Sequence, residues 1–278
     1  DFIFSFHNIH LSFIEKKDTF KLFKVGISTL YKFFILELFF YNFFKKENLD
    51  KISVKKEDLY EENLDSLFNY FNSLRKLHDY SNFFHTNFKD LKDKKLDILE
   101  IGAAKGDGIA SFYFYFPNAF FIGLDNNPFR NNYKSHRIRN IYVDISSKKI
   151  LRNLTNHLNQ KFDLIIEDCS HKLIDQILCF AENFKNLKNG GIYVVEDLNF
   201  PEIHTMYNPT NEQTTLKSIL TKIEDKKEVI TDFIDVSTIE YLKKNIESIK
   251  IYKSKNKNNY KIHDVCDYSE IAFIKKKY

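Results

Sequence analysis

Short apolar runs that end in carboxylates recur along the second half of the chain. The run 96–101 leads into a glycine-containing turn, and later runs end at Asp125, at Asp144, at Asp168 and at the pair Glu196–Asp197. Such runs, bounded by turn residues, are typical of buried strands. Between the last two runs, apolar residues recur at the spacing of a helix face: Ile174, Ile177, Leu178, Ala181, Phe184 and Leu187. The pattern therefore predicts parallel strands joined by helices.

The pattern also predicts how this helix ends and how the sheet is completed. Asn189-Gly190-Gly191 supplies residues that suit a left-handed helix C-cap. Residues 215–223 and 236–246 have helical spacing, and two late runs at 248–252 and 271–275 read as strands. We therefore expect an α/β fold in which five parallel strands are followed by a late antiparallel hairpin.

The N-terminal part of the chain has a different pattern. Apolar residues between positions 59 and 74 recur at helical spacing, and residues 1–50 are rich in Phe. We expect a helical N-terminal region over residues 1–93, in which residues 1–50 form an appendage, followed by a second domain over residues 94–278. The appendage suits packing on a neighbouring part of the chain, on a partner subunit or on a membrane surface.

One apolar segment of this appendage, Val25–Phe44, is nearly long enough to span a bilayer. Lys32 and Glu37 interrupt it, and a charge at the centre of a membrane helix costs about 3 kcal/mol on insertion scales. A buried or surface-lying helix is therefore the favoured interpretation, with membrane association through residues 1–50 as the alternative.

Composition narrows the class of protein. With 43% hydrophobic residues, 29 Phe and 16 Tyr, the chain of 278 residues can bury a large core. Only 7 Gly and 4 Pro argue against a many-turned sandwich or a disordered chain. The net charge of +4, from 42 basic and 38 acidic residues, gives no reason to expect a nucleic-acid partner. Three cysteines without paired spacing indicate a reducing, cytoplasmic setting.

The strand ends carry the candidate chemistry. Parallel sheets bind ligands at the carboxyl ends of their strands, which brings together Asp168, His171, Glu196 and Asp197. Three carboxylates and an imidazole at one edge predict a metal site with a base beside it. The alternatives are that the two adjacent acids are merely solvated and that His171 only begins a helix.

The first turn of this region predicts a nucleoside site. Glu100, Gly102, Ala103 and Gly106 form a turn in which the backbone can pass close to a ligand at a helix N-terminus. A dinucleotide fingerprint would need Gly at positions 102, 104 and 107, but positions 104 and 107 hold Ala and Asp. Binding of a pyrophosphate is therefore disfavoured.

Two further strand ends extend this site. Asp125 is placed to accept hydrogen bonds from ribose hydroxyls, unless it only forms a turn with the following Asn-Asn-Pro. Asp144 suits either an adenine amino group or the N-cap of the next segment. Together these acids describe a nucleoside without phosphate, and a positive centre on it would be favoured among so many carboxylates.

These motifs carry a resemblance to a known family. LEIGAAKG, followed by IGLD and YVD, resembles the cofactor-binding region of class I S-adenosylmethionine-dependent methyltransferases, over roughly residues 75–278. More narrowly, EDCSH followed by GGIYVVEDL resembles the metal-dependent sugar O-methyltransferases, which include mycinamicin-type macrolide methyltransferases and relatives in bacterial polysaccharide gene clusters.

The resemblance implies a Rossmann-like methyltransferase sheet, S-adenosyl-L-methionine as cofactor and a sugar or nucleotide-sugar acceptor. It implies that Mg²⁺ or Mn²⁺ is bound by Asp168, Glu196 and Asp197, with His171 as the base. A divalent ion would lower the pKa of a sugar hydroxyl, which His171 could then deprotonate. We expect a homo-oligomer. The alternatives are a metal-dependent methyltransferase of phenols or other small molecules, and a non-catalytic module that binds a membrane or partner through residues 1–50.

Three aromatic residues are weaker candidates. His78-x-Tyr80 resembles a family pattern near the cofactor, but Tyr80 also suits the core. The irregular segment Leu198–Glu212 follows the last parallel strand and is long enough for a lid. His204 and Tyr207 within it are candidate substrate contacts or plain loop residues.

The chain departs from the family at two positions. Cys169 stands where the family usually has Gly, and Glu167 where it often has Asp. If position 169 requires a positive φ, Cys169 carries strain of about 1 kcal/mol or more. A thiol here also favours a softer metal, although three carboxylate ligands favour Mg²⁺ or Mn²⁺.

Overall fold

The structure is a computed structural model of the chain. It describes the following residues: 3–6, 9–12, 46–53, 64–127, 130–145, 149–151, 154, 158–257 and 267–278. The apolar segment Val25–Phe44 and Cys266 lie outside them. Within the described parts of the chain, no helix combines the length and the apolar character needed to cross a bilayer.

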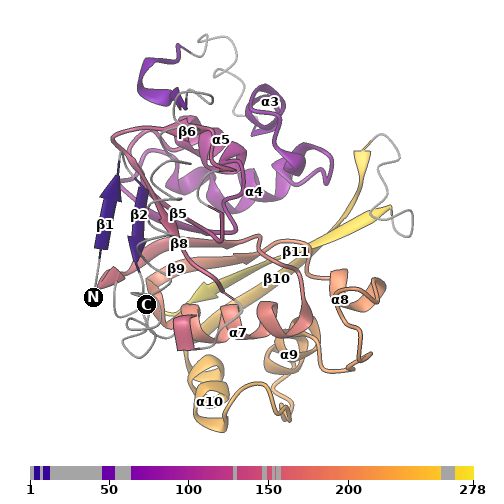
Figure 1. Cartoon of the computed structure of the whole chain (residues 1–278). Helices are drawn as coiled ribbons and strands as arrows, with labels where there is room; N and C mark the ends of the chain where they lie inside the picture. The colour runs from indigo at the N-terminus through magenta and orange to yellow at the C-terminus, as the bar shows by residue number, and fades with distance from the viewer. Residues whose placement is uncertain are drawn as a thin grey trace.

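A nine-stranded sheet forms the centre of the molecule (Figure 1). Its five central strands are parallel, β11 pairs antiparallel with β9, and β10 pairs antiparallel with β11. This confirms the predicted parallel strands and late hairpin. In order across the sheet the strands are β1 (Ile3–Phe6), β2 (Ile9–Ser12), β7 (Ile138–Tyr142), β5 (Phe120–Asp125), β4 (Asp97–Ile101), β8 (Phe162–Glu167), β9 (Leu187–Val195), β11 (Tyr268–Lys276) and β10 (Ile246–Lys255).

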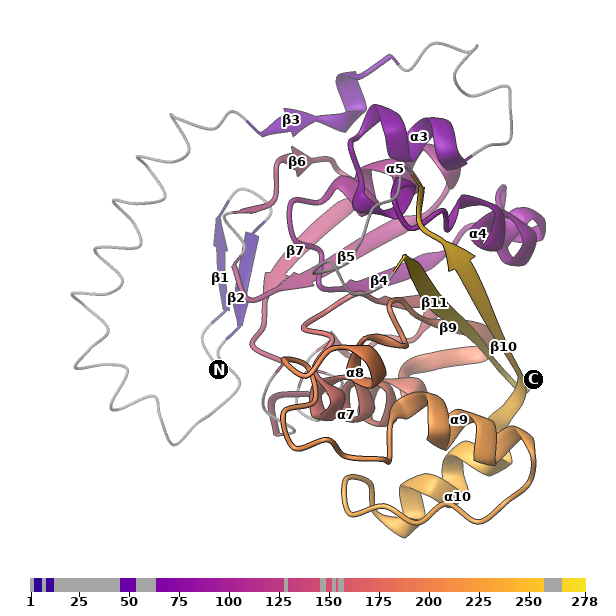
Figure 2. The same ribbon diagram turned by 90° about the vertical axis from the view of Figure 1, so that its right-hand side faces the viewer.

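Helices cover both faces of this sheet (Figures 1 and 2). One face carries α3 (Leu64–Tyr70), α4 (Ser81–Phe88) and α5 (Asp107–Tyr115), and the other carries α7 (Leu173–Asn183), α9 (Leu216–Glu224) and α10 (Val236–Asn245). The remaining elements are α8 (Phe200–Ile203), the 3₁₀ turns η1 (Leu49–Lys51), η2 (Leu74–Lys76), η3 (Lys89–Leu91) and η5 (Phe184–Asn186), and a small sheet of β3 (Glu47–Asn48) and β6 (Tyr133–Lys134).

The two faces bury separate hydrophobic cores, because side chains of a strand alternate between faces. Ile165 of β8 packs in the core beneath α7 (the α7-side core), whereas Ile166 packs in the core beneath α3, α4 and α5 (the α5-side core). Phenylalanines dominate the α5-side core, where the ring of Phe112 lies 5.7 Å from Phe68 and 5.1 Å from Phe84. Among the residues that the structure describes, phenylalanines are thus concentrated between the N-terminal helices and the sheet.

The described part of residues 1–50 differs from the predicted helical appendage. Residues 3–6 and 9–12 form an antiparallel pair of strands, and β2 continues the large sheet next to β7. In the second strand, Ile9 and Leu11 alternate with His10 and Ser12, which is the period of a strand. The predicted helices are present at α3 and α4.

The predicted helix C-cap at Asn189-Gly190-Gly191 is wrong. Helix α7 ends at Asn183, and the glycines lie in β9, where the pairing with β8 shifts register. Gly190 has φ +77°. A positive φ is needed at an irregularity in a strand as much as at a helix end, so the same residues suit both.

Candidate active site

The turn after β4 and the loop after β8 are in direct contact. Gly102 has φ +95°, and a Cβ atom there would overlap the backbone carbonyl oxygen of Asp168. The N–H groups of Gly102 and Ala103 both donate to the carbonyl of Leu124 at the end of β5, at 2.8 and 2.9 Å. Glycine is therefore required at position 102 for close approach, and the predicted nucleoside site adjoins the predicted metal site.

The other nucleoside-site residues lie around the same turn. Gly106 has φ +81° and is the N-cap of α5. Asp125 accepts hydrogen bonds from the N–H groups of Ala104, at 2.8 Å, and Asn127, at 2.7 Å, so the backbone on both sides fixes its carboxylate. Asp144 follows β7 and is exposed.

Three of the four residues predicted at the metal site come together. Nε2 of His171 lies 3.7 Å from Oδ1 of Asp168 and 3.9 Å from Oδ2 of Asp197. One potential ligand atom from each of these residues lies within 4.8 Å of the others. The ends of β8 and β9 thus converge as their sequence pattern predicts.

Glu196, the fourth residue, faces a buried arginine. Nε of Arg75 donates to Oε1 of Glu196 at 2.7 Å, and Nη2 of Arg75 donates to Oε1 of Glu100 at 3.1 Å. Nη2 also lies 3.6 Å from Oδ2 of Asp168. Arg75 therefore connects the first acid of the nucleoside site with two acids of the metal site.

The acidic partners of Arg75 keep it charged against the effect of burial. Burial alone would lower the pKa of Arg75, but Glu196 and Glu100 raise it well above its ordinary value, so the guanidinium stays charged. Burial also raises the pKa of Glu196 and of Glu100, and Arg75 opposes this effect for both. One cation thus faces three carboxyl groups.

Sequence reasoning missed Arg75. It lies in the 3₁₀ turn η2, which precedes α4, with its guanidinium carbon 5.9 Å from the ring centre of Phe84 and 5.3 Å from that of Phe112. Only five of the 42 basic residues are arginines. In a chain that otherwise uses lysine, a rare planar donor next to apolar residues was the available signal.

Tyr80 and His78 approach the site from the N-terminal region. The hydroxyl of Tyr80 donates to Oδ1 of Asp197 at 2.7 Å, and burial raises the pKa of this phenol well above its ordinary value. Nδ1 of His78 lies 2.7 Å from Oγ of Ser269 and 3.7 Å from Oδ1 of Asp197. The structure thus places Tyr80 against a predicted metal ligand as well as in the core.

Aromatic rings surround His171. Its ring centre lies 4.9 Å from Phe200 of α8 and 5.9 Å from Tyr207, and the rings of Phe200 and His204 are 5.4 Å apart. The carbonyl of Tyr207 accepts a hydrogen bond of 2.9 Å from the N–H of Leu173 at the start of α7. The segment predicted as a lid is therefore docked beside the histidine, with Tyr207 partly exposed.

Left-handed backbone conformations gather at this site. Ala104, His171 and Asp197 have φ values of +44°, +56° and +52°. Such conformations cost about 1–3 kcal/mol each in residues other than glycine and cluster at functional sites. Cys169 is not among the described residues with positive φ. The strain considered for Cys169 is therefore absent, and His171 carries it instead.

Comparisons with known proteins concern the family and the fold of the chain. The family model described as "Methyltransferase domain" matches residues 92–262. The chain is 28% identical to the 8-demethyl-8-alpha-L-rhamnosyl tetracenomycin-C 2'-O-methyltransferase of Streptomyces olivaceus over 129 residues, which are 44% of this chain and 34% of that protein. It is 29% identical to the mycinamicin VI 2''-O-methyltransferase of Micromonospora griseorubida over 133 residues, 44% of this chain and 32% of that protein. The matches thus span about a third of the length of these relatives.

Among solved structures, the chain is similar to the MycE methyltransferase from the mycinamycin biosynthetic pathway in complex with Mg, SAH and mycinamycin VI. The TM-score is 0.58 and the identity 21%, over 77% of this chain and 54% of that one. At this identity the similarity concerns the fold, which is that of a Rossmann-like methyltransferase.

Proposed function

Because the chain belongs to the methyltransferase domain family, we propose that it is an enzyme that transfers a methyl group from S-adenosylmethionine to a sugar hydroxyl. The relatives that carry out 2'- and 2''-O-methylation, by their names, support this choice of acceptor. As the acceptor we propose a nucleotide sugar or a glycan precursor, which would serve the synthesis of a surface polysaccharide or a natural product. The free thiols of Cys169 and Cys179 suit a reducing, cytoplasmic compartment, and we expect a homo-oligomer.

The observation that carries the proposal is the contact between Gly102 and Asp168. It places the backbone turn of the nucleoside site against the loop that bears the acids and His171. A methyl donor bound at the turn and an acceptor bound at the acids would then be neighbours, and positioning of two reactants supplies much of the rate of such a transfer.

The residues at the edge fit a divalent metal ion. Asp168 and Asp197 present oxygen atoms within 4.8 Å of each other and of a ring nitrogen of His171, and Arg75 contacts both Asp168 and Glu196. Carboxylate oxygens suit Mg²⁺ or Mn²⁺. We propose Asp168, Glu196 and Asp197 as the ligands, with Glu196 bound to Arg75 through Oε1. Such an ion, when bound, lowers the pKa of a coordinated hydroxyl.

The chain's own groups would then act as follows. Glu100, Asp125 and Asp144 would orient the nucleoside part of the methyl donor, together with the backbone from Gly102 to Gly106. Nε2 of His171 would accept the proton of the acceptor hydroxyl, because a neutral imidazole is an effective base near pH 7. Tyr207 and the neighbouring His204 would contact the acceptor ring.

Binding measurements test the proposal. S-adenosylhomocysteine should bind to the chain in calorimetry, and the Asp168→Ala variant should retain this binding while it loses turnover. Asp168 supplies a side chain to the metal and only its backbone to the turn, which is why the two effects should separate. Unchanged turnover in EDTA would reject the role of the metal, and absence of any S-adenosylhomocysteine binding would reject the enzyme itself.

The acceptor needs its own experiment, because vicinal hydroxyls of a catechol suit the same metal chemistry as those of a sugar. A panel of nucleotide sugars and catechols, assayed with labelled S-adenosylmethionine, should show methylation of a sugar. Methylation of catechols alone would show that the acceptor is a phenol and not a sugar. Methylation of neither, with the donor bound, would favour the alternative of a non-catalytic module.

A further inference from the structure

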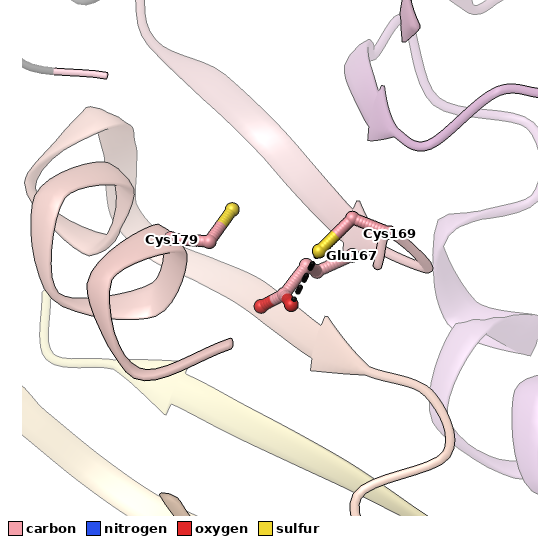
Figure 3. A group of neighbouring side chains, drawn as sticks. All are labelled: Glu167, Cys169 and Cys179. Carbon is pink, nitrogen blue, oxygen red and sulfur yellow. Dashed lines mark hydrogen bonds between the residues drawn. The ribbon is translucent and has the colours of Figure 1, made fainter. Parts of the chain in front are cut away.

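Two cysteines and a glutamate form a cluster between the end of β8 and α7 (Figure 3). One potential ligand atom of each of Glu167, Cys169 and Cys179 lies within 4.8 Å of the others. Sγ of Cys169 donates to Oε1 of Glu167 at 3.1 Å. Glu167 ends β8, Cys169 follows two residues later, and Cys179 projects from α7.

The cluster is separate from the active site because side chains alternate along β8. Ile165 belongs to the α7-side core and Ile166 to the α5-side core. The alternation continues past the strand end: Asp168 approaches Arg75 beneath the N-terminal helices, whereas Cys169 packs on the α7-side core. Asp168 thus faces one side of the sheet, and Glu167 with the two thiols faces the other.

The surroundings of the cluster are enclosed. Glu167 is 2% exposed and Cys179 is fully buried, whereas Cys169 is partly exposed and leaves access from the loop. The hydroxyl of Tyr193, in β9, donates to Oε2 of Glu167 at 3.3 Å and lies 3.7 Å from Sγ of Cys179. Both carboxyl oxygens of Glu167 therefore accept from uncharged groups, the thiol of Cys169 and the hydroxyl of Tyr193. Glu196, in contrast, is paired with the cation of Arg75.

We propose that Glu167, Cys169 and Cys179 form a second metal site, selective for a soft divalent cation such as Zn²⁺. Thiolates and carboxylates are both ligands that Zn²⁺ accepts, and thiolates disfavour Mg²⁺. Water completes the tetrahedral set, and Tyr193 orients the carboxylate from outside it. The site is independent of methyl transfer, and the two metal sites are distinguished by the chemistry of their ligands.

Cadmium is a suitable probe, because Cd²⁺ bound to thiolates absorbs in the ultraviolet whereas Zn²⁺ does not. In excess Mg²⁺, which occupies the carboxylate site, the reduced chain should bind one equivalent of Cd²⁺ with a thiolate charge-transfer band. Zn²⁺ should displace the Cd²⁺, and excess Mg²⁺ should not. Absence of the band at one equivalent, or its loss in Mg²⁺, would overturn the proposal.

Variants assign the band to this cluster. Cys169→Ser should weaken Cd²⁺ binding by about 100-fold or more, and Tyr193→Phe, which removes only an outer contact, by about 10-fold. Cys179→Ala provides a second ligand variant should Cys169→Ser fail to fold. Cys266→Ser, the third cysteine, is the matched control and should bind as the wild type does. A band that survives both ligand variants, or that disappears in the control, would place the metal elsewhere and reject the site.

Discussion

At the scale of single residues, Arg75 is the group on which the candidate site depends most. Replacing it by Met leaves Glu100, Asp168 and Glu196 without their cation, and removal of one partner from a buried ion pair costs about 3–5 kcal/mol. We expect Arg75→Met to lower the free energy of unfolding by this amount in urea denaturation. Arg75→Lys, which keeps the charge but not the planar donor, should lose less. Equal stability of Arg75→Met and wild type would show that the acids are neutralised in another way.

Gly108 offers a control that keeps the arginine. Gly→Ala inside a helix normally stabilises by up to about 1 kcal/mol. A Cβ atom on Gly108 in α5 would, however, overlap Nη1 of Arg75 and lie 2.7 Å from Oε1 of Glu100. Because Glu196 and Glu100 hold the guanidinium in place, Gly108→Ala should instead destabilise by about 1–3 kcal/mol. In the Arg75→Met background this penalty should shrink, since the overlapping atom is gone.

His171 is the residue whose role is purely chemical in the proposal. His171→Ala should lower kcat by roughly 10²- to 10⁴-fold, the usual contribution of a general base, with little change in S-adenosylhomocysteine affinity. Steady-state kinetics together with calorimetry measure both quantities. Wild-type kcat in this variant would remove His171 from the mechanism.

The sequence predicted the residues at the strand ends better than it predicted their partners. Asp168, His171 and Asp197 lie together because each follows a strand of one parallel sheet, and that regularity is readable from apolar runs. Arg75 contacts Glu196 across 121 residues of sequence, and Tyr80 contacts Asp197 across 117. No local periodicity encodes such long-range pairing, so it could not be derived from the pattern. The roles assigned to these residues stay predictions.

At the scale of elements, Asp50 links the short turn η1 to the sheet layer. Its carboxylate accepts hydrogen bonds from the hydroxyls of Tyr113, in α5, and Ser135, both at 2.7 Å. Burial would raise its pKa, but these hydrogen bonds and that of the His136 N–H lower it to about 2. This pKa shift corresponds to about 2 kcal/mol of folding free energy. Because Asp50 is partly exposed, solvent screening reduces its contribution to about 1 kcal/mol.

The lowered pKa of Asp50 determines how its contribution to the free energy of unfolding changes with pH. The folded-state pKa of Asp50, about 2, lies below its ordinary value of 3.8, so the stabilisation is complete above about pH 4 and is lost as the pH falls towards 2. Asp50→Asn should therefore be less stable than wild type by about 1 kcal/mol at pH 6, and the difference should vanish near pH 2. Urea denaturation across this range measures it, with the exposed Asp90→Asn as control. A difference independent of pH would mean that Asp50 acts without its charge.

Helices and strands were predicted correctly where apolar residues recur at a regular period. They were missed where the same sequence feature is found in two kinds of element. The strands of the parallel sheet and helices α9 and α10 agree with their predicted positions within a few residues. Gly190 was assigned to a helix end but lies in a strand, because glycine reports a positive φ and not the element that needs it. The short strands β1 and β2 were missed because a strand period over only four residues is too short to distinguish a strand from a helix.

At the scale of the whole molecule, the N-terminal helices share a core with the sheet. The ring of Phe84, in α4, lies 5.1 Å from that of Phe112 and 5.7 Å from that of Phe273 in β11. Phe84→Ala should cost about 3–5 kcal/mol. Because the contact is shared, we expect one cooperative unfolding transition and faster hydrogen exchange in β4 and β8. Unchanged exchange in these strands would support a separate N-terminal domain that ends at residue 93.

The distance in sequence between Arg75 and Glu196 has a consequence for the order of events during synthesis. At about 5–20 residues per second, the 121 residues between them take roughly 6–24 s to be made. For that interval the emerging chain holds an arginine whose main acidic partner does not yet exist, and Glu100, 25 residues on, is the first to reach it. A nascent chain halted before residue 196 should therefore keep its N-terminal helices open to proteases, and extension by a few tens of residues should close them.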